Sequence, residues 1–269
     1  MKTESPFLRK INKVGTVLYP LLFGVLIFAL LQTGTLQKLM GVDEFVLPRP
    51  LNIGTIISGS LPKVMLNVKA TLIASLGGLT LGSLFGYLIA VIATVFPKWG
   101  AGGLSIVAAF NAIPIVALAP VITNWTKDVS SNAEVRSMVA KIIVVMLMCT
   151  ATMSINAYRG LTELKPFSKD LLESYAARKV IIFTKLRLPN SLPYVFTALR
   201  VSVPLSVISA LVSEYFAEFI IGVGRQIREN IVLAQYATAW AYITVACLIG
   251  VTLYALLILL ESILLRHRS

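Results

Sequence analysis

The sequence ATLIASLGGLTLGSLFGYLIAVIATVF, residues 70–96, decides the fold class of this chain. The segment has no charged residue, and it exceeds the roughly 20 helical residues needed to cross the hydrocarbon core of a bilayer. It also contains small residues at a four-residue spacing: Ala74, Gly78, Gly82, Gly86 and Ala90. On a helix this spacing forms a continuous stripe that lets another backbone approach closely in lipid. We therefore predict a transmembrane helix whose stripe packs within its own subunit, with a subunit interface or a moving gate as the alternative.

Similar apolar segments recur along the whole chain. The composition is 57% hydrophobic and only 13% charged, against roughly 25% charged residues in soluble domains. The mean hydropathy is +0.84. The candidate spans are residues 16–34, 70–96, 101–123, 139–157, 199–221 and 239–265. The sequence thus predicts an all-α integral membrane protein with about six transmembrane helices, forming a single domain over residues 1–269 with a core at 68–265.

The basic residues of the chain indicate its orientation in the membrane. The formal net charge is +12, but Lys and Arg lie mainly beside the apolar segments, so membrane topology explains them better than nucleic acid binding does. The densest group lies between the fourth and fifth spans: Arg159, Lys165, Lys169, Arg178, Lys179, Lys185 and Arg187. We expect this loop and both termini to lie in the bacterial cytoplasm, with the first apolar segment retained as an uncleaved span.

Catalytic and metal-binding motifs are missing from the sequence. Cys149 and Cys247 lie inside apolar segments, and His267 is the single histidine, which excludes a His-based triad. No Gly-x-x-x-x-Gly-Lys-[Ser/Thr] phosphate loop occurs, so ATP hydrolysis is not expected here. Asp170 and Glu173 are spaced as on one face of a helix, which solvation explains. We therefore predict a protein that is not an enzyme and binds no cofactor or metal.

The basic loop, about residues 158–191, is the most informative part of the sequence. Residues 169–186 contain no Gly or Pro and are compatible with a helix, which Leu188 and Pro189 are expected to end. We predict a helix over residues 170–189 on the cytoplasmic face. It has two interpretations: an interfacial helix that binds anionic lipid headgroups, or a docking element for a cytoplasmic partner.

The spacing in this loop resembles the coupling loop of binding-protein-dependent ABC importer permeases. That pattern is Glu-Ala-Ala, three residues, Gly, nine residues, then Ile-x-Leu-Pro. Asp170 stands at the Glu, Ala176 at the Gly and Leu186 at the Ile, whereas Leu171 and Leu172 replace the Ala pair. Leu188 and Pro189 match the pattern outright. The predicted coupling residues are Asp170, Glu173, Tyr175, Ala176, Ala177, Leu186, Leu188 and Pro189.

Further stretches resemble the same family in order and spacing. They are Leu47-Pro48-Arg49-Pro50, residues 113–120 followed by Trp125, Lys141-Ile142, residues 156–161, and Glu214 followed by Gly222-Val223-Gly224. The residue sequences that begin at Ser174 and at Leu186 are similar to those of one subgroup of this family. That subgroup contains the permeases for nitrate, sulfonates, taurine, thiamine-precursor pyrimidines and riboflavin. One departure is the segment 126–136, which is longer and more polar than the family's usual short turn.

The resemblance implies a type I importer transmembrane domain and a set of partners. These are a dimer of cytoplasmic ATP-binding subunits that carry ATP and magnesium, an extracytoplasmic substrate-binding protein, a second copy of this chain, and membrane lipid. The transported substrate would be small and soluble, with the pyrimidine or vitamin branch favoured. The alternative is a secondary transporter or channel that acts alone. Few intramembrane charges and no obvious internal repeat favour the importer.

Polar residues and prolines within the spans are candidates for the transport pathway. Glu214 and Glu218 are one helical turn apart, so they share one face of the helix. They either line a pathway or take part in a structural ion pair or hydrogen bond. Pro114, next to Asn111, interrupts the third span, and Asn124 lies at the external boundary beside Trp125, where Trp is a common anchor. The pathway candidates are Asn111, Pro114, Asn124, Glu214 and Glu218.

Overall fold

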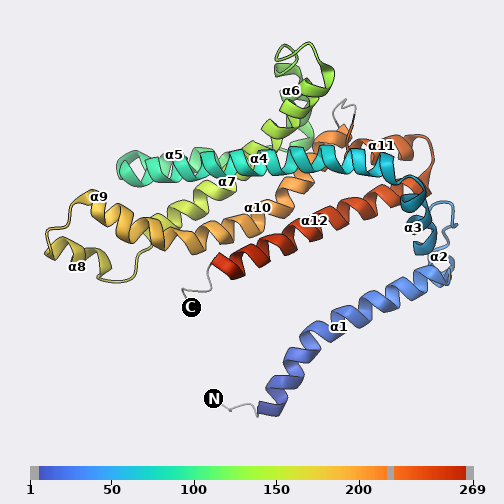
Figure 1. Ribbon diagram of the computed structural model, residues 1–269, viewed down its shortest axis with the longest axis horizontal. Coiled ribbons are helices and arrows are strands. Elements are labelled where there is room, and N and C mark those ends of the chain that lie inside the picture. The colour runs from blue at the N-terminus through green and yellow to red at the C-terminus, as the bar shows by residue number, and fades with distance from the viewer. Residues whose placement is uncertain (1–5, 217–220, 265–269) are drawn as a thin grey trace. The chain divides into compact units, whose positions relative to one another are not determined.

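The computed structural model describes residues 6–216 and 221–264, in which every regular element is a helix (Figure 1). The chain forms two compact units, one within Met1–Leu61 and Asn230–Ala241, and the other within Pro62–Glu229 and Tyr242–Ser269. The elements, in chain order, are α1 (Pro6–Gln32), α2 (Thr35–Met40), α3 (Pro50–Gly59), α4 (Leu61–Val95), α5 (Pro97–Ala109), η1 (Phe110–Ala112), α6 (Ile115–Trp125), α7 (Ala133–Thr162), α8 (Ser168–Ser174), α9 (Lys179–Ile182), η2 (Phe183–Arg187), α10 (Leu188–Phe216), α11 (Val223–Val232) and α12 (Tyr236–Leu264).

The described helices fit a membrane protein. Four of them are long and apolar enough to cross a bilayer: α4, α7, the continuous helix Lys179–Phe216 and α12. A fifth crossing is possible if a bent pair of helices counts as one span, and α1 contributes a shorter apolar stretch over Leu18–Gln32. These segments correspond in order to the six predicted spans, and the all-α membrane class is confirmed.

The first unit contains two short helices that the hydropathy pattern did not indicate. Pro50 occupies the first turn of α3, where its missing N–H costs no helical hydrogen bond. The buried Gln37 side chain of α2 donates to the carbonyls of Leu31 and Leu47, at 3.0 and 3.3 Å. The indole Nε1 of Trp240 donates to the Val46 carbonyl at 2.9 Å. The segment that contains the Leu-Pro-Arg-Pro sequence is therefore held by specific polar contacts.

The second unit is built around close packing of α4 on α7. The stripe of small residues on α4 is buried against α7 within the chain. A Cβ atom on Gly82 would lie 2.6 Å from the Met146 carbonyl oxygen, and one on Gly86 would lie 2.6 Å from that of Thr150. Only hydrogen fits at these positions, which is why the stripe reads Gly-x-x-x-Gly. Ala74 and Ala90, at the two ends of the stripe, are fully buried.

Helix α10 lies along the same core and joins it to α12. Phe196, Val203 and Ala210 of α10 pack with Val145 and Cys149 of α7, and the cluster also includes Ala74 and Leu79 of α4 and Leu257 of α12. A second cluster joins Ala90, Met153, Ala157, Leu161 and Ala198. Figure 1 shows α4 running across α7 and α10. Helices α4, α7 and α10 therefore share one apolar core.

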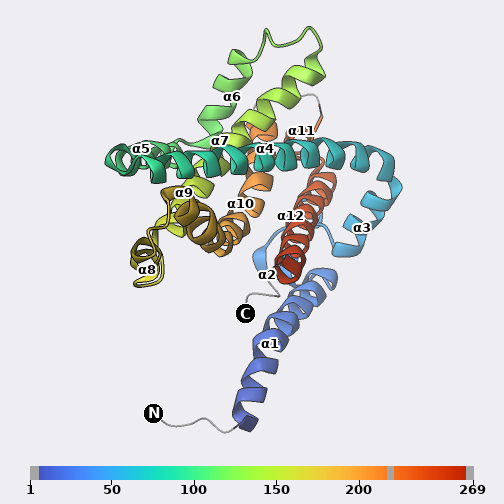
Figure 2. The same cartoon turned by 60° about the vertical axis from the view of Figure 1, so that its left-hand side comes forward.

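The third predicted span is not one straight helix. The helical segments Gly102–Ala112 and Ile115–Trp125 meet at an angle of 99°. Ile113 and Pro114 are extended at this break, because a proline disfavours the α conformation in the residue before it. Helix α6 then packs beside the first half of α7, through Ala119 and Ile122 against Ala140 and Val144 (Figure 2). The interruption at Pro114 is therefore a sharp corner.

Candidate functional site

The end of α7 is tied to the start of α10 by side chains that bond to backbone carbonyls. Asn190 Nδ2 donates to the carbonyl oxygens of Gly160 and Glu163, at 2.8 and 3.0 Å. Arg187 Nη1 donates to the Leu161 carbonyl at 3.2 Å. The last carbonyls of a helix have no partner within the helix itself, so η2 and α10 supply their partners. We call this junction the α7–α10 corner.

Close packing reinforces the α7–α10 corner. A Cβ atom on Gly160 would lie 2.8 Å from both the Cα of Ser191 and the Cβ of Tyr194, so the two helices are in near-backbone contact there. The hydroxyl groups of Tyr87 and Ser191 are 2.9 Å apart, which links the corner to α4. Most of the residues involved, though not Tyr87 and Glu163, belong to two sequence stretches that resemble the importer family, residues 156–161 and 186–194. Their resemblance therefore has a structural reason: they hold the same corner.

The expectation of one helix over residues 170–189 is wrong. Helix α8 ends at Ser174, a new helix begins at Lys179, and Ala176 between them has a left-handed backbone with φ of +54°. L-residues other than Gly adopt this conformation at a cost of roughly 1–2 kcal/mol. Ala176 stands where the importer pattern has Gly, so that glycine position corresponds to a left-handed turn.

Leu188 and Pro189 also do not end a helix. Residues 179–216 form one continuous helix, which includes a π-helical turn at Phe183–Arg187 immediately before Leu188 and Pro189. Such a turn is a common local response where the regular hydrogen-bond ladder is disturbed, and Pro189 and Pro193 both lack an N–H group. The predicted coupling residues are thus divided: Asp170 and Glu173 lie on α8, Tyr175, Ala176 and Ala177 in the turn, and Leu186, Leu188 and Pro189 on the long helix.

The loop that contains α8 presents apolar side chains to its surroundings. Phe167, Leu171 and Tyr175 are 81%, 58% and 78% exposed. Charged residues lie among them, including the ion pair between Lys169 and Glu173 at 3.2 Å. An apolar surface with a polar rim is typical of an interaction site. The loop thus has the composition of a surface that another molecule covers.

A second polar centre lies between α4, α7 and α10, and its core is the pair of Lys141 and Glu214. Lys141 Nζ is 3.2 Å from Glu214 Oε1, and both residues are buried. The Thr71 hydroxyl donates to the same carboxylate at 2.9 Å from Oε2. Glu214 is therefore in a structural ion pair. Lys141, near the start of the predicted span 139–157, is buried within α7.

The remaining pathway candidates do not join this centre. Asn111, Pro114 and Asn124 are exposed, on η1, at the break before α6 and near the end of α6. Glu218 lies outside the described residues. The segment 126–136, which departs from the importer pattern, makes a turn and then starts α7, where Asn132 Oδ1 accepts from the Glu134 N–H at 2.8 Å. These candidates remain predictions.

One ion pair within the spans was not anticipated from the sequence. Arg200 of α10 binds Glu261 of α12 through two hydrogen bonds, 2.7 Å from Nε to Oε2 and 2.9 Å from Nη2 to Oε1. The two residues are far apart in sequence, and each lies near the edge of an apolar segment. The sequence did contain a signal for this ion pair, because Arg200 and Glu261 are oppositely charged and lie at corresponding depths of neighbouring spans. The pair fixes α12 to α10.

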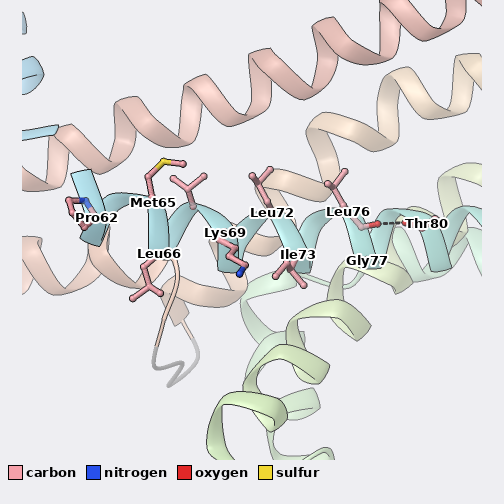
Figure 3. A pocket seen from close by; sticks show the side chains of 10 residues that line it. Pro62, Met65, Leu66, Lys69, Leu72, Ile73, Leu76, Gly77 and Thr80 are labelled. Carbon is pink, nitrogen blue, oxygen red and sulfur yellow. Dashed lines mark hydrogen bonds between the residues drawn. The ribbon is translucent and has the colours of Figure 1, made fainter. Parts of the chain in front are cut away.

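The outward face of α4 is apolar and shallowly grooved. The groove, of about 820 Å³, is lined by α4 residues that include Met65, Leu72 and Leu76. Figure 3 shows these three side chains on one side of α4, while Lys69 projects to the other side with Leu66 and Ile73. In the part of the chain that the structure describes, no group of His, Cys, Asp and Glu could hold a metal ion.

Comparison with known proteins agrees with these features. A family model described as "Binding-protein-dependent transport system inner membrane component" matches residues 78–268. The formylaminopyrimidine transport permease protein ThiX of Halalkalibacterium halodurans is 29% identical over 230 residues, covering 84% of this chain and 88% of that protein. The riboflavin transport system permease protein RibX of Chloroflexus aurantiacus is 29% identical over 239 residues, covering 86% and 84%.

Two solved structures share the fold. An amino acid ABC transporter, crystallised with histidines, superposes with a TM-score of 0.60 at 16% identity, covering 76% of this chain and 95% of that chain. The inward-facing methionine ABC transporter MetNI superposes with a TM-score of 0.54 at 16% identity, covering 73% and 96%. The family model matches more than half of the length of this chain. The chain therefore belongs to the binding-protein-dependent inner membrane components, the permeases of ABC importers.

Proposed function

We propose that this chain is the membrane path of an importer that receives a small soluble molecule from an external binding protein and releases it into the cytoplasm by alternating access. The observation that carries the proposal is the loop of residues 163–178. It joins two long helices that are bonded to each other at the α7–α10 corner, and it presents Phe167, Leu171 and Tyr175. A force applied to this loop reaches both helices together.

The partner at this loop would be a separate ATP-binding subunit. The chain has no phosphate loop in its sequence, so energy from ATP must come from another polypeptide. Apolar side chains that are exposed to water on a short helix supply the contact area that a protein partner needs. Two copies of this chain would face two ATP-binding subunits, and both termini and the loop would lie in the cytoplasm, as the Lys and Arg distribution indicates.

The docking surface can be tested with two matched variants. Leu171 and Val129 are both 58% exposed, but the proposed topology places them on opposite sides of the membrane. Leu171→Asp should weaken binding of the ATP-binding subunit by at least about tenfold, because a charge would replace a central apolar contact. Val129→Asp should leave it unchanged. Equal binding by both variants would refute docking at α8.

The names of the relatives support a proposal for the substrate class. One is a formylaminopyrimidine permease and another a riboflavin permease by name, which favours a small nitrogen heterocycle related to vitamins. The importer, assembled from this chain with the ATP-binding and binding-protein subunits of its own organism, should take up radiolabelled formylaminopyrimidine or riboflavin into proteoliposomes only when ATP is supplied. Uptake by this chain alone, without ATP, would instead support a stand-alone transporter or channel.

A further inference from the structure

The start of α11 is held by side chains from other helices. The first N–H groups of a helix have no partner in the helix itself. Here the N–H of Gly222 donates to Asn67 Oδ1 at 2.9 Å, that of Val223 to the Thr71 hydroxyl at 3.0 Å, and that of Gly224 to Glu214 Oε2 at 2.9 Å. Three successive backbone donors are thus satisfied by α4 and α10.

The Lys141–Glu214 pair lies at the centre of these contacts. Glu214 accepts from Lys141, from the Thr71 hydroxyl and from the Gly224 N–H. Lys141 also donates to the Ile221 carbonyl, so the cation bonds to the segment before α11 as well as to the carboxylate. Lys141, Glu214 and Thr71 are each at most 1% exposed, and a buried carboxylate placed at a helix N-terminus is stabilised by the helix dipole.

Glycine at positions 222 and 224 is required by this arrangement. A Cβ atom on Gly222 would lie 2.2 Å from the Glu214 carboxyl carbon, and the residue has a φ of +152°. A Cβ atom on Gly224 would lie 2.2 Å from the Leu211 carbonyl oxygen. The Gly-Val-Gly sequence after Glu214 therefore allows the backbone to lie directly against the carboxylate and α10.

We propose that Lys141, Glu214 and Thr71 form a clasp that fixes the first turns of α11 to the α4–α7–α10 core, so that these turns move with the core as one body. The clasp joins three helices and the start of a fourth at one point. Without it, the start of α11 would keep its covalent link to α10, but its first N–H groups would lose their partners. The clasp lies within the chain, so it does not depend on the identity of the substrate.

Spin-label distances test the clasp directly. Nitroxide labels would be placed at Glu134 on α7 and Arg228 on α11, after Cys149→Ala and Cys247→Ser, in the full-length protein in nanodiscs. The starting protein should give one narrow distance distribution between the labels. Glu214→Gln and Lys141→Met preserve approximate size but remove the charges, and each should abolish the single narrow peak. Glu261→Gln, which breaks the ion pair with Arg200 on α12, should retain it.

A milder variant tests the clasp if the charge variants fail to fold. Thr71→Val preserves shape and the ion pair but removes the hydroxyl that bonds both Val223 and Glu214. It should broaden the same distance distribution and increase hydrogen exchange of the amides at 222–224. An unchanged narrow peak together with unchanged amide exchange in folded Thr71→Val, or an unchanged peak in folded Glu214→Gln, would overturn the clasp.

Discussion

The ammonium of Lys141 and the carboxylate of Glu214 lie 3.2 Å apart, although 73 positions separate them in the sequence. The pair is shielded from solvent, so removal of one partner leaves an uncompensated charge. Lys141→Met should lower the free energy of unfolding by about 3–5 kcal/mol. The double variant Lys141→Met/Glu214→Leu should recover part of this loss, because it leaves no buried charge.

Unfolding in mixed detergent micelles would measure both effects. The comparison that matters is the non-additivity of the single and double variants, since independent sites add within a few tenths of a kcal/mol. If the double variant loses as much stability as the two single variants summed, the charges are not coupled and the ion pair does not contribute as described.

Glycines on α4 and α5 should respond oppositely to alanine. In Gly86→Ala, the new methyl group would meet the Thr150 carbonyl of α7, and the required shift should cost about 1–3 kcal/mol. Gly103 of α5 has no atom within 4 Å of its Cβ position, so Gly103→Ala should stabilise the helix by roughly 0.5–1 kcal/mol. Thermal unfolding of the two variants in the same detergent is the measurement, and equal shifts would contradict α4–α7 packing along the stripe.

Ala176 carries backbone strain that glycine would relieve. Because Ala176 has a φ of +54°, Ala176→Gly should stabilise the turn after α8 by about 1 kcal/mol. Its neighbour Ala177, which has no such backbone, is the control: Ala177→Gly should be neutral or destabilising, because glycine only adds freedom to the unfolded chain. Hydrogen exchange across residues 168–178 should slow in the first variant and not in the second.

The sequence predicted α4, α7 and α12 well, because each is one long apolar helix, whereas the third predicted span contains a sharp corner and the fifth belongs to a helix that begins at Lys179. It predicted the loop helix badly, since a run without Gly or Pro is compatible with a helix but does not require one. The break at Ala176 is a local helix end: the Ala176 N–H donates to the Glu173 carbonyl and the Ala177 N–H to the Leu172 carbonyl, as where a helix ends at a left-handed residue. The importer pattern has a glycine at this position, and that glycine was the sequence signal for a left-handed turn.

Pairs of charges were the least predictable part of the site. Lys141 lies near the start of the predicted span 139–157, whereas the helix in fact begins earlier, at Ala133. Glu214 could be interpreted as a pathway residue or as half of an ion pair, and its partner lies on another helix. Contacts between distant segments require the packing of α7 against α10, which hydropathy alone does not contain.

The orientation can be tested by cysteine labelling from outside intact cells. The background would carry Cys149→Ala and Cys247→Ser, because Cys247 is exposed in the chain. A membrane-impermeant maleimide should label Ser131→Cys, in the turn before α7, and should label Ser168→Cys, at the start of α8, only after the cells are opened. The reverse pattern would place the α8 loop outside and rule out docking to a cytoplasmic ATPase.

The α7–α10 corner should transmit motion only while its carbonyls are bonded across the two helices. Asn190→Ala removes the bonds to Gly160 and Glu163, which should cost about 1–3 kcal/mol of stability. Asn156→Ala is the matched control, because the Asn156 amide bonds within its own helix, to the Thr152 carbonyl at 2.9 Å. That control should change stability by no more than about 0.5 kcal/mol.

The same two variants separate a mechanical role of the corner from a purely stabilising one. In the assembled importer, Asn190→Ala should still bind the ATP-binding subunit, because α8 is untouched, yet hydrogen exchange across residues 163–178 should rise. The substrate-bound binding protein should then no longer stimulate ATP hydrolysis, because a loosened loop does not transmit the conformation of the spans to the ATP-binding subunit. A normal response in Asn190→Ala, with the loop protected as in the starting protein, would show that the corner serves stability alone and that coupling runs through other contacts of the long helix.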